Sequence, residues 1–361
     1  MDTVLQALQQ RIQAAHERGQ PLVIQGGGTR GFHGHPVEGD LLDVTPLSGI
    51  SSYEPTELVV TARAGTALAE LEAALAAQGQ CLPFEPPRFG AASTVGGMVA
   101  TGFSGPARAS VGALRDHMLG LSLLNGRGEL LSFGGQVMKN VAGYDVSRVV
   151  AGSLGVLGVI CEVSLKVLPR PPAQATLRFE LDQAAALKAV NTWAGKPLPL
   201  HASACWNGML VVRLAGAAAA VEAATQQLGG ERIPDEMAQG FWDGVRDQRD
   251  EFFLSAERAL GSGAALWRLS VPATAPALNL SGEQLIEWHG AQRWLCTSTA
   301  AAAVREAARA VGGHATLWRG NDRSAGVFAP LDPATERIHR ALKAAFDPAH
   351  ILNRGRMYPW L

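Results

Sequence analysis

Three consecutive glycines at the end of a short apolar run constrain this chain more than any other feature. The run 22–24 (Leu-Val-Ile) predicts a short buried strand, and it leads almost directly into glycines 26–28. Glycine has no Cβ and adopts positive φ readily, so a ligand can approach such a main chain closely. Successive N–H groups in a turn form a concave surface that holds an anion, and Thr29 and Arg30 add further donors. The stretch therefore predicts a loop that cradles a diphosphate, with a plain glycine-rich turn as the alternative.

The same loop spells G-x-G-x-x-G from Gly26 to Gly31, the signature of a dinucleotide-binding Rossmann domain. That fold requires a helix directly after the glycines, because the helix N-terminus meets the phosphates. Here residues 32–36 read Phe-His-Gly-His-Pro, and a glycine and a proline within five residues prevent such a helix. The loop is therefore expected to hold phosphate without a helix, and an NAD-binding Rossmann domain is not expected.

The composition changes near a proline-rich segment at residues 169–172. All eight tryptophans lie beyond residue 190, whereas 25 of the 41 glycines lie in the first 170 residues. A length of 361 residues suits two or three domains, each with its own core. We expect a glycine-lined ligand-binding domain over 1–170 and a smaller α+β domain with an antiparallel sheet over 171–331. A C-terminal helix and tail over 332–361 are expected to return to the first domain.

Local patterns predict a strand-rich first domain. Thr66 is expected to cap a helix that runs to about residue 78. The dipeptide 125–126 (Asn-Gly) predicts a two-residue type I′ turn in a hairpin over 121–133. Residues 159–167 alternate, so the odd-numbered side chains of this strand are expected to face one way. In the second domain, strands are expected on either side of 207–208 (Asn-Gly).

Several motifs in the same order resemble the FAD-linked oxidases of the vanillyl-alcohol oxidase type, whose flavin domain is called the PCMH domain. These motifs are Gln25–Thr29, Ser93–Gly97, Gly152–Ile160 and Leu352–Arg356. Further runs resemble one branch of this family, the FAD-binding subunits of bacterial glycolate oxidases: Leu82–Gly90, Ser104–Arg108, Gly112–Asp116 and Lys139–Asp145. The resemblance is dense over about residues 20–170 and thin elsewhere. It implies an α+β fold, with a PCMH-type FAD-binding domain followed by a smaller α+β cap domain.

The resemblance implies FAD as the cofactor, with its diphosphate held by main-chain N–H groups of the first loop and by the Thr29 hydroxyl. The segment 155–160 is expected to pass the adenine, and the tail 353–356 to reach the isoalloxazine ring. His33 and His35 are expected to be ordinary loop histidines, not metal ligands or sites of covalent flavin attachment. The residues expected to bind FAD are Gln25, Gly26, Gly27, Gly28, Thr29, Arg30, Pro86, Thr94, Gly96, Gly97, Thr101, Gly102, Ser104, Gly105, Asp116, Gly155, Gly158, Ile160, Asn353 and Arg356.

The function that this resemblance implies is that of an FAD-dependent oxidoreductase subunit in a glycolate oxidase complex, taking part in electron transfer as glycolate is oxidised to glyoxylate. The implied partners are a larger FAD-containing subunit and an iron–sulfur subunit, with glycolate or a similar 2-hydroxy acid as substrate. Catalytic relatives carry a Gly-His-x-Gly-Asp-Gly-Asn-x-His motif in the C-terminal domain. Here the nearest stretch, 312–316, holds one histidine, so no catalytic residue is assigned. A stand-alone oxidase of another small alcohol or hydroxy acid, and a scaffold with a degenerate flavin site, stay open.

The tail departs from the family pattern Leu-Asn-Pro-Gly-Lys, because Arg354 replaces the proline and Arg356 the lysine. Arg356 keeps a positive charge at the last position, although arginine and lysine differ in geometry. Just before the tail, Asp347 is expected to cap a turn.

Composition excludes several other classes of protein. A formal net charge of -1 gives no electrostatic reason to expect a nucleic-acid partner. The four cysteines are at least 44 residues apart and form no C-x-x-C, which argues against an iron–sulfur or zinc site and suits a reducing compartment. No apolar run approaches the roughly 18 residues that span a bilayer. We expect a cytoplasmic protein that reaches the inner face of the membrane only through its complex.

Overall fold

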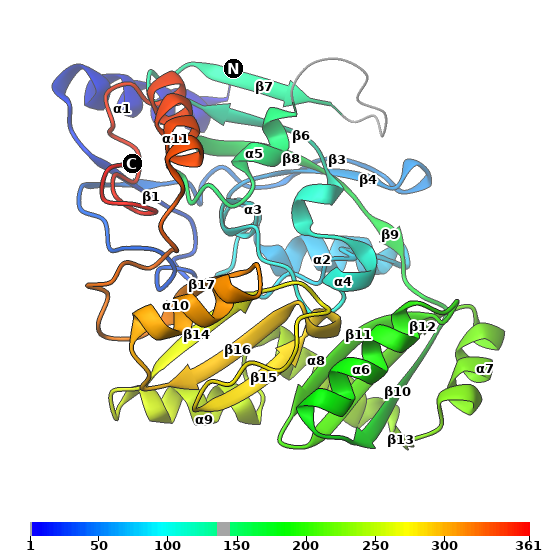
Figure 1. Ribbon diagram of the computed structural model, residues 1–361. Coiled ribbons are helices and arrows are strands. Elements are labelled where there is room, and N and C mark those ends of the chain that lie inside the picture. The colour runs from blue at the N-terminus through cyan, green and yellow to red at the C-terminus, as the bar shows by residue number, and fades with distance from the viewer. Residues whose placement is uncertain (1, 136–144) are drawn as a thin grey trace. The chain divides into compact units, whose positions relative to one another are not determined.

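The structure is a computed structural model that describes residues 2–135 and 145–361. Its chain falls into two compact units, both drawn in Figure 1. Unit 1 is formed by Met1–Phe103, Ala113–Pro169 and Pro330–Leu361, and unit 2 by Ser104–Gly112 and Arg170–Ala329. Residues 104–112, expected in the first domain, thus belong to unit 2. The Lys139–Asp145 motif lies outside the described residues except for Asp145.

Unit 1 is built on a five-stranded antiparallel sheet in the order β3-β4-β8-β6-β7. The strands are β3 (Ile50–Glu54), β4 (Val59–Arg63), β6 (Met118–Leu124), β7 (Leu130–Gly134) and β8 (Val159–Lys166). Helices α2 (Leu68–Ala77) and α3 (Val95–Thr101) cover one face, where buried side chains such as Leu71, Met98 and Val163 form the core. This core holds the sheet under the two helices.

The strict alternation expected along β8 is wrong, because the strand carries a one-residue bulge at Cys161. Its pairing with β6 shifts there, from Ser122 opposite Glu162 to Leu123 opposite Ile160. A bulge moves the following side chains to the other face. Val159 and Cys161 therefore pack in a second core, whereas Ile160 joins the core under α2 and α3.

A smaller layer of unit 1 joins the two ends of the chain. Strand β1 (Leu22–Gln25) pairs in parallel with β2 (Asp40–Asp43), and α1 (Thr3–Arg18) packs on them through Leu8 and Ile12. Asp2 caps α1, and Gly19 ends it with φ 63°. After α11 (Pro333–Phe346) the C-terminal tail returns to β1, where Leu352 forms a parallel bridge with Leu22. The remaining short elements of this unit are η1 (Pro55–Glu57), β5 (Gln80–Cys81), η2 (Leu114–His117), α5 (Val146–Val150) and β9 (Leu168–Pro169).

Unit 2 is built on an eight-stranded antiparallel sheet in the order β13-β10-β12-β11-β15-β16-β14-β17. Its strands are β10 (Ala173–Glu180), β11 (Leu200–Trp206), β12 (Met209–Gly216), β13 (Glu231–Ile233), β14 (Ala265–Ser270), β15 (Glu283–Glu287), β16 (Gln292–Thr297) and β17 (His314–Arg319). Its helices are α4 (Arg108–Val111), α6 (Gln183–Ala194), α7 (Ala218–Leu228), α8 (Asp235–Asp247), α9 (Glu251–Leu260), η3 (Trp288–Gly290) and α10 (Ala301–Ala310).

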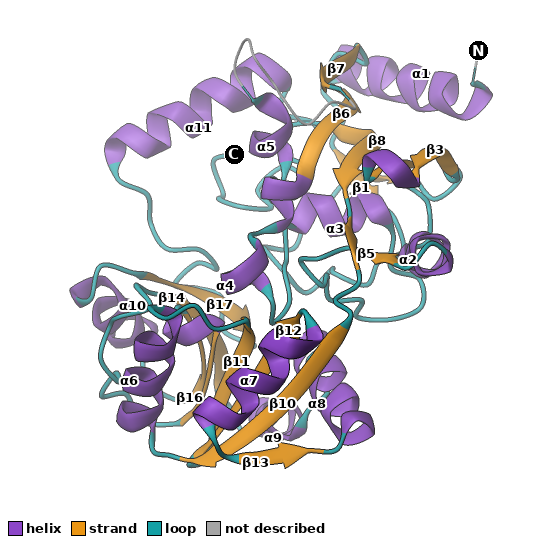
Figure 2. Ribbon diagram, turned by 90° about the vertical axis from the view of Figure 1, so that its right-hand side faces the viewer, coloured by secondary structure: helices purple, strands orange, loops and turns teal. Residues whose placement is uncertain are grey.

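Helices cover both faces of this sheet (Figure 2), with α6, α7 and α10 on one face and α8 and α9 on the other. Adjacent strand residues point to opposite faces. Accordingly, Leu177 of β10 packs in the core under α6 and α7, whereas the neighbouring Thr176 accepts a hydrogen bond from Trp242 Nε1 of α8 at 3.1 Å. Some of the tryptophans lie on this second face, where Trp294 and Trp318 pack edge to face.

Two further local predictions in unit 1 are wrong. Thr66 does not cap α2; its hydroxyl instead bonds the main chain of Gly49, and the helix starts from Ala67 without a side-chain cap. The hairpin β6–β7 forms, but its turn is longer than two residues. The Asn125 side chain accepts hydrogen bonds from the N–H groups of Arg127 and Glu129, so the residues between the strands curl around it.

Candidate functional site

A cavity that is partly open to solvent lies in unit 1 beside the first glycine loop. Its walls come from β1 and the loop 26–31, from α3, from the segment that leads into β8, and from the C-terminal tail. Four parts of the chain that are distant in sequence therefore meet at one site.

The glycines allow the two glycine-rich loops to touch, main chain against main chain. A Cβ on Gly27 would lie 1.5 Å from the carbonyl oxygen of Ala92, and one on Gly26 would lie 2.5 Å from Thr94 Oγ1. A Cβ on Gly96 would lie 2.7 Å from the Cβ of Ala64. A larger residue at Gly27 or Gly96 would displace the main chain, and one at Gly26 would displace the Thr94 side chain. The cavity wall is thus a direct consequence of the glycine pattern.

The first loop presents a row of unused donors. Within residues 2–135 and 145–361, no hydrogen bond engages the main-chain N–H groups of Gly26, Gly27, Gly28 or Thr29. All four residues line the cavity, and Gly28 adopts φ 70°. Consecutive N–H groups of this kind form an anion-binding concavity. A helix does not follow, as residues 29–34 form turns and a bend.

The N–H groups of the second glycine-rich loop are engaged within the fold. A short helix, α3, begins here, and Thr94 caps it by accepting a hydrogen bond from Gly97 N at 3.2 Å. Gly96 N donates to the carbonyl of Ala64 at 2.7 Å, and the Thr101 hydroxyl donates to the carbonyl of Gly97 at 2.9 Å. These donors already serve the fold. This loop therefore supplies cavity surface, and the first loop supplies the donors for an anion.

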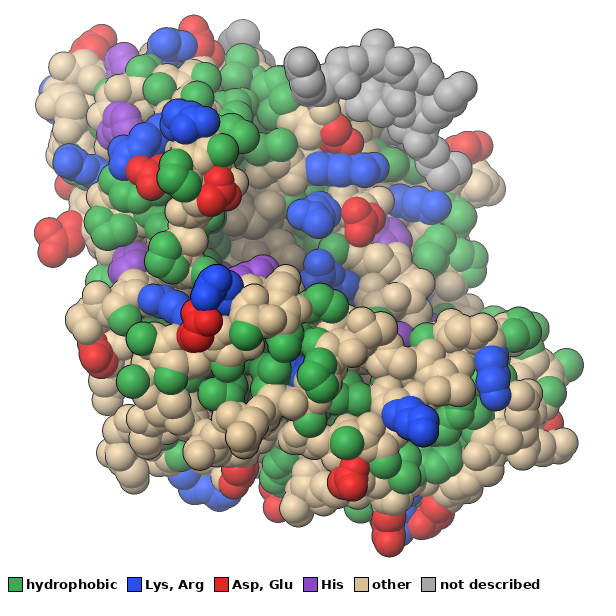
Figure 3. Space-filling view, viewed as in Figure 1, with side chains coloured by type: hydrophobic (Ala, Val, Ile, Leu, Met, Phe, Trp, Pro, Cys, Tyr) green, Lys and Arg blue, Asp and Glu red, His purple; other side chains and the backbone are tan. Residues whose placement is uncertain are grey.

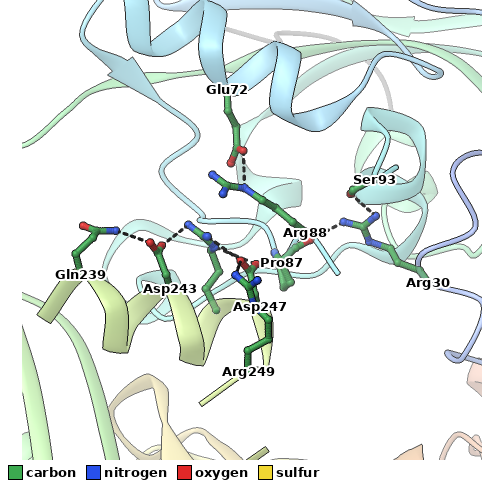
Figure 4. Close-up of polar contacts among 10 residues, drawn as sticks. Arg30, Glu72, Pro87, Arg88, Ser93, Gln239, Asp243, Asp247 and Arg249 are labelled. Atoms are coloured by element: carbon green, nitrogen blue, oxygen red, sulfur yellow. Dashed lines mark hydrogen bonds and ion pairs between the residues drawn. The ribbon is translucent and has the colours of Figure 1, made fainter. Parts of the chain in front are cut away.

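Arg30 adds a buried positive charge to the cavity wall (Figure 4). Its guanidinium donates to Ser93 Oγ at 2.7 Å and to the carbonyl of Pro87 at 2.5 Å, which braces the two loops. Arg88, next in the same loop, is instead paired with Glu72 at 2.7 Å. The two oxygens that accept these hydrogen bonds from Arg30 are neutral.

The C-terminal tail closes another part of the wall. Asn353 Oδ1 accepts a hydrogen bond from Ile24 N at 2.8 Å, and its Nδ2 donates to the carbonyl of Leu154 at 2.7 Å. Arg356 donates to the carbonyl oxygens of Gly31 at 2.9 Å and His35 at 3.0 Å. One amide side chain thus joins β1 to the segment before β8, and the arginine joins the tail to the first loop.

The structure brings together most of the residues expected to bind the cofactor. Those that line the cavity are Gln25, Gly26, Gly27, Gly28, Thr29, Arg30, Thr94, Gly96, Gly97, Thr101, Gly155, Gly158, Ile160, Asn353 and Arg356. Those that do not line it are Pro86, Gly102, Ser104, Gly105 and Asp116. Gly102 ends α3 with φ 64°, and the Asp116 carboxylate accepts a hydrogen bond from Ala113 N within its own turn. His33 and His35 do not line it either.

The sequence reasoning missed the apolar part of the wall. The missed lining residues are Val23, Ile24, Gly31, Val37, Val44, Ala64, Ala100 and Leu154. Side chains of this type look like ordinary core residues, so only their position in the fold reveals them. One part of the wall presents free N–H groups beside a cation, and another part presents aliphatic side chains. This combination suits a ligand that carries a diphosphate and flat rings.

Unit 2 holds a separate group of buried polar side chains. Burial raises the pKa of Glu287 to about 7, although Trp294 Nε1 and Gln292 Nε2 donate hydrogen bonds to its carboxylate at 2.5 and 2.9 Å. His289 bonds Ser203 Oγ through Nδ1 at 3.0 Å, and burial lowers its pKa. His314, the one histidine of residues 312–316, begins β17. A cavity of unit 2, whose lining includes Ser255, Glu283 and Cys296, does not include these groups.

Basic and acidic side chains are interspersed over the surface that Figure 3 shows, in keeping with the net charge of -1. Among the helices that the structure describes, none is long and apolar enough to cross a membrane.

Comparison with known proteins gives concordant results. The FAD binding domain family matches residues 4–134. The glycolate oxidase subunit GlcE of Escherichia coli K12 is 46% identical over 353 residues, which is 98% of this chain and 97% of that protein. The glycolate oxidase subunit GlcD of Bacillus subtilis is 31% identical over 183 residues, which is 50% of this chain and 39% of that protein.

Among solved structures, an alkyldihydroxyacetonephosphate synthase superposes with a TM-score of 0.66, covering 96% of this chain and 75% of its own. At 16% sequence identity this likeness concerns the fold alone. Together with the domain match, it confirms the expected α+β fold with a PCMH-type domain and an antiparallel second sheet.

Proposed function

The chain belongs to the family of the glycolate oxidase subunit GlcE, and we propose that it is the FAD-binding subunit of a complex that oxidises glycolate or a similar 2-hydroxy acid. FAD, the expected cofactor, is confirmed by the match to the FAD binding domain. The observation that carries the proposal is the row of unused N–H donors at residues 26–29, which lines the cavity beside the buried Arg30. This donor set suits a diphosphate, the group that FAD carries between its two ring systems.

Within this proposal, the chain's residues have distinct roles. The N–H groups of residues 26–29 and the Thr29 hydroxyl bind the diphosphate, and Arg30 balances its negative charge. Each charge-assisted hydrogen bond of this kind contributes about 1.5–3 kcal/mol. Residues 155–160, which lead into β8, lie along the adenine. Asn353 and Arg356 orient the tail toward the flavin ring. The other expected residues that line the cavity are proposed to contact FAD by van der Waals packing.

Bound FAD supplies a two-electron acceptor that can pass electrons on one at a time. A cation near the pyrimidine edge of the ring stabilises its reduced, anionic form, and we propose Arg356 for this role. The chain's own contribution is therefore to hold the cofactor and tune it. We assign no proton transfer to this chain, because its stretch 312–316 holds one histidine and lacks the motif of catalytic relatives.

The family relationship supports a multi-subunit assembly, since the relatives are named as glycolate oxidase subunits. We propose that the partners are a larger FAD-containing subunit, which oxidises the substrate, and an iron–sulfur subunit. The chain is proposed to lie in the cytoplasm and to reach the membrane only through them. All four cysteines are free thiols, and those at 161, 205 and 296 are buried.

Two measurements test the proposed function. The purified chain should take up one FAD, and should not reduce it when glycolate is added without oxygen. The reconstituted complex should reduce a dye with glycolate, and omission of this chain should abolish that activity. A chain that binds no FAD would favour the scaffold alternative. A chain that reduces its own FAD with a small hydroxy acid would favour the stand-alone oxidase.

A further inference from the structure

Helix α11 buries a charged pair where an amphipathic helix normally buries apolar side chains. Lys343 is the one fully buried residue of this helix, and Asp347 follows one turn later; both side chains are 0% exposed. Lys343 Nζ and Asp347 Oδ2 are 2.7 Å apart. Burial lowers the pKa of Lys343, and the facing carboxylate opposes that shift. Buried ion pairs are costly unless further hydrogen bonds satisfy both groups, so the surroundings of this pair must compensate.

Both charges are satisfied, and their partners belong to the tail and to the segment that leads into β8. Besides Asp347, the ammonium donates to the carbonyl oxygens of Val156 at 2.8 Å and Leu352 at 2.9 Å. The carboxylate accepts from the N–H groups of Ile351 at 3.2 Å and Leu352 at 2.8 Å. Leu352 is thus gripped through both its N–H and its carbonyl group. Asp347 was expected to cap a turn, and it does so as half of this ion pair.

Ile351 and Leu352, which the ion pair bonds, are adjacent in sequence to the tail residues of the proposed FAD site. Leu22 N donates to the carbonyl of Ile351 at 2.7 Å, and Asn353 N donates to the carbonyl of Leu22 at 3.0 Å, so the tail lies along β1. The next side chain, that of Asn353, bonds both Ile24 and Leu154 in the cavity wall. Val156 belongs to the same wall segment as Leu154. The ion pair therefore fixes the position of the tail relative to β1 and to the segment that leads into β8. Both of these segments contribute to the cavity wall.

We propose that the buried Lys343–Asp347 pair is a latch that fixes the C-terminal tail on β1 and so positions Asn353 and Arg356 for FAD. The inference rests on the proposed function only in taking the ligand to be FAD. Neither residue lines the cavity, so both are positioning residues. The tail has a small apolar anchor of its own, in which Leu361 packs on Val156 and Leu157. The latch thus holds the middle of the tail.

The test compares the wild-type chain with the double variant K343M/D347N, which keeps the side-chain volumes and removes both charges. Replacing a complete buried pair by neutral groups is often harmless to stability, so the apoprotein should still fold and melt cooperatively. The carbonyl oxygens of Val156 and Leu352 lose the bonds donated by Lys343, whereas the amide oxygen at position 347 can still accept from the tail. FAD binding to the apoprotein should therefore weaken by about tenfold, the effect of one to two lost hydrogen bonds. Amide hydrogen exchange at Leu352 and Asn353 should accelerate. The variant R337M, which changes an exposed cation on the same helix, should match the wild type in all measurements.

The outcomes separate the latch from the proposed function. An unchanged FAD affinity with unchanged exchange at Leu352 in the double variant overturns the latch. A wild-type chain that binds no FAD overturns the proposed function, and the exchange rates then decide the latch alone. If the double variant does not fold, the wild type decides: the latch requires the Leu352 and Asn353 amides to exchange as slowly as those of β8. Exchange as fast as at the start of α1 refutes it.

Discussion

The sharpest test of the cofactor site is the substitution Gly27→Ala. An added Cβ would lie 1.5 Å from the carbonyl oxygen of Ala92. Non-bonded carbon atoms sit about 3.5 Å from their neighbours, so the two loops must separate by about 2 Å. The atom in the way is main chain, which no rotamer change can move aside. The substitution therefore displaces the loop itself.

A displacement of this size removes the hydrogen bonds that the loop is proposed to make. Donor–acceptor distances beyond about 3.2 Å leave the normal range for N–H groups and oxygen. If two of the N–H groups at 26–29 lose the diphosphate, at about 1.5–3 kcal/mol each, binding weakens by about 3–6 kcal/mol. This corresponds to a rise in the dissociation constant of roughly a hundredfold to ten-thousandfold.

The assay is titration of the apoprotein with FAD, followed by flavin fluorescence, with circular dichroism and thermal unfolding to check the fold. The matched control is Gly240→Ala in α8, where an added Cβ meets no atom within 4 Å. Because alanine is favoured over glycine in a helix by about 1 kcal/mol, the control should be slightly stabilised and bind FAD normally. A folded Gly27→Ala chain that binds FAD as tightly as the wild type would refute the proposed cradle.

Three further predictions concern stability and binding. Asn353→Ala leaves the Ile24 N–H and the Leu154 carbonyl without their partner, so urea unfolding should show a loss of about 2–4 kcal/mol, and Asn353→Asp should not restore it because it lacks the donor. Glu287→Gln should stabilise the chain at about pH 8 and lose this advantage by about pH 5: the folded-state pKa of about 7 exceeds the ordinary 4.5, so ionisation costs stability increasingly as the pH rises between these values. A pH-independent difference in melting temperature would contradict it. Thr94→Val should weaken FAD binding and cost about 1 kcal/mol through the lost helix cap, whereas Thr94→Ser should retain the cap and most of the affinity.

The two Asn-Gly dipeptides show when local sequence alone predicts a turn and when it does not. At 207–208 both residues have positive φ, 50° and 73°, and form the two-residue turn between β11 and β12. At 125–126 the same dipeptide forms a longer turn. Gly126 N donates to the carbonyl of Phe346, and a Cβ on Gly126 would lie 2.3 Å from the Asp347 carboxylate. A contact with the C-terminal region thus overrides the turn preference.

Other differences have the same origin. The bulge at Cys161 turns Ile160 toward the core under α3, and Ile160 also lines the cavity, which alternation alone could not anticipate. Helix α3 forms in spite of two glycines, because Thr94 caps it and it packs between α2 and the sheet. The N–H groups of Gly96 and Gly97 donate to the Ala64 carbonyl and to the capping Thr94 hydroxyl. The unused donors therefore lie in the first loop, where the resemblance implied the diphosphate.

The glycine pattern, the absence of a helix after it and the ordered motifs were enough to predict the fold family, the cofactor and most of the cavity wall. Each motif is a short local run that depends on backbone freedom, and the resemblance to the family implied which of these runs meet. The grip of Lys343 and Asp347 on Leu352, and the contact of Gly27 with Ala92, could not be predicted. A lysine in a largely polar helix looks like a surface residue until the fold buries it. A glycine in a sequence gives no indication of which main-chain segment will pack against it. Such contacts join segments up to hundreds of residues apart, and their energies exist only once packing has excluded water.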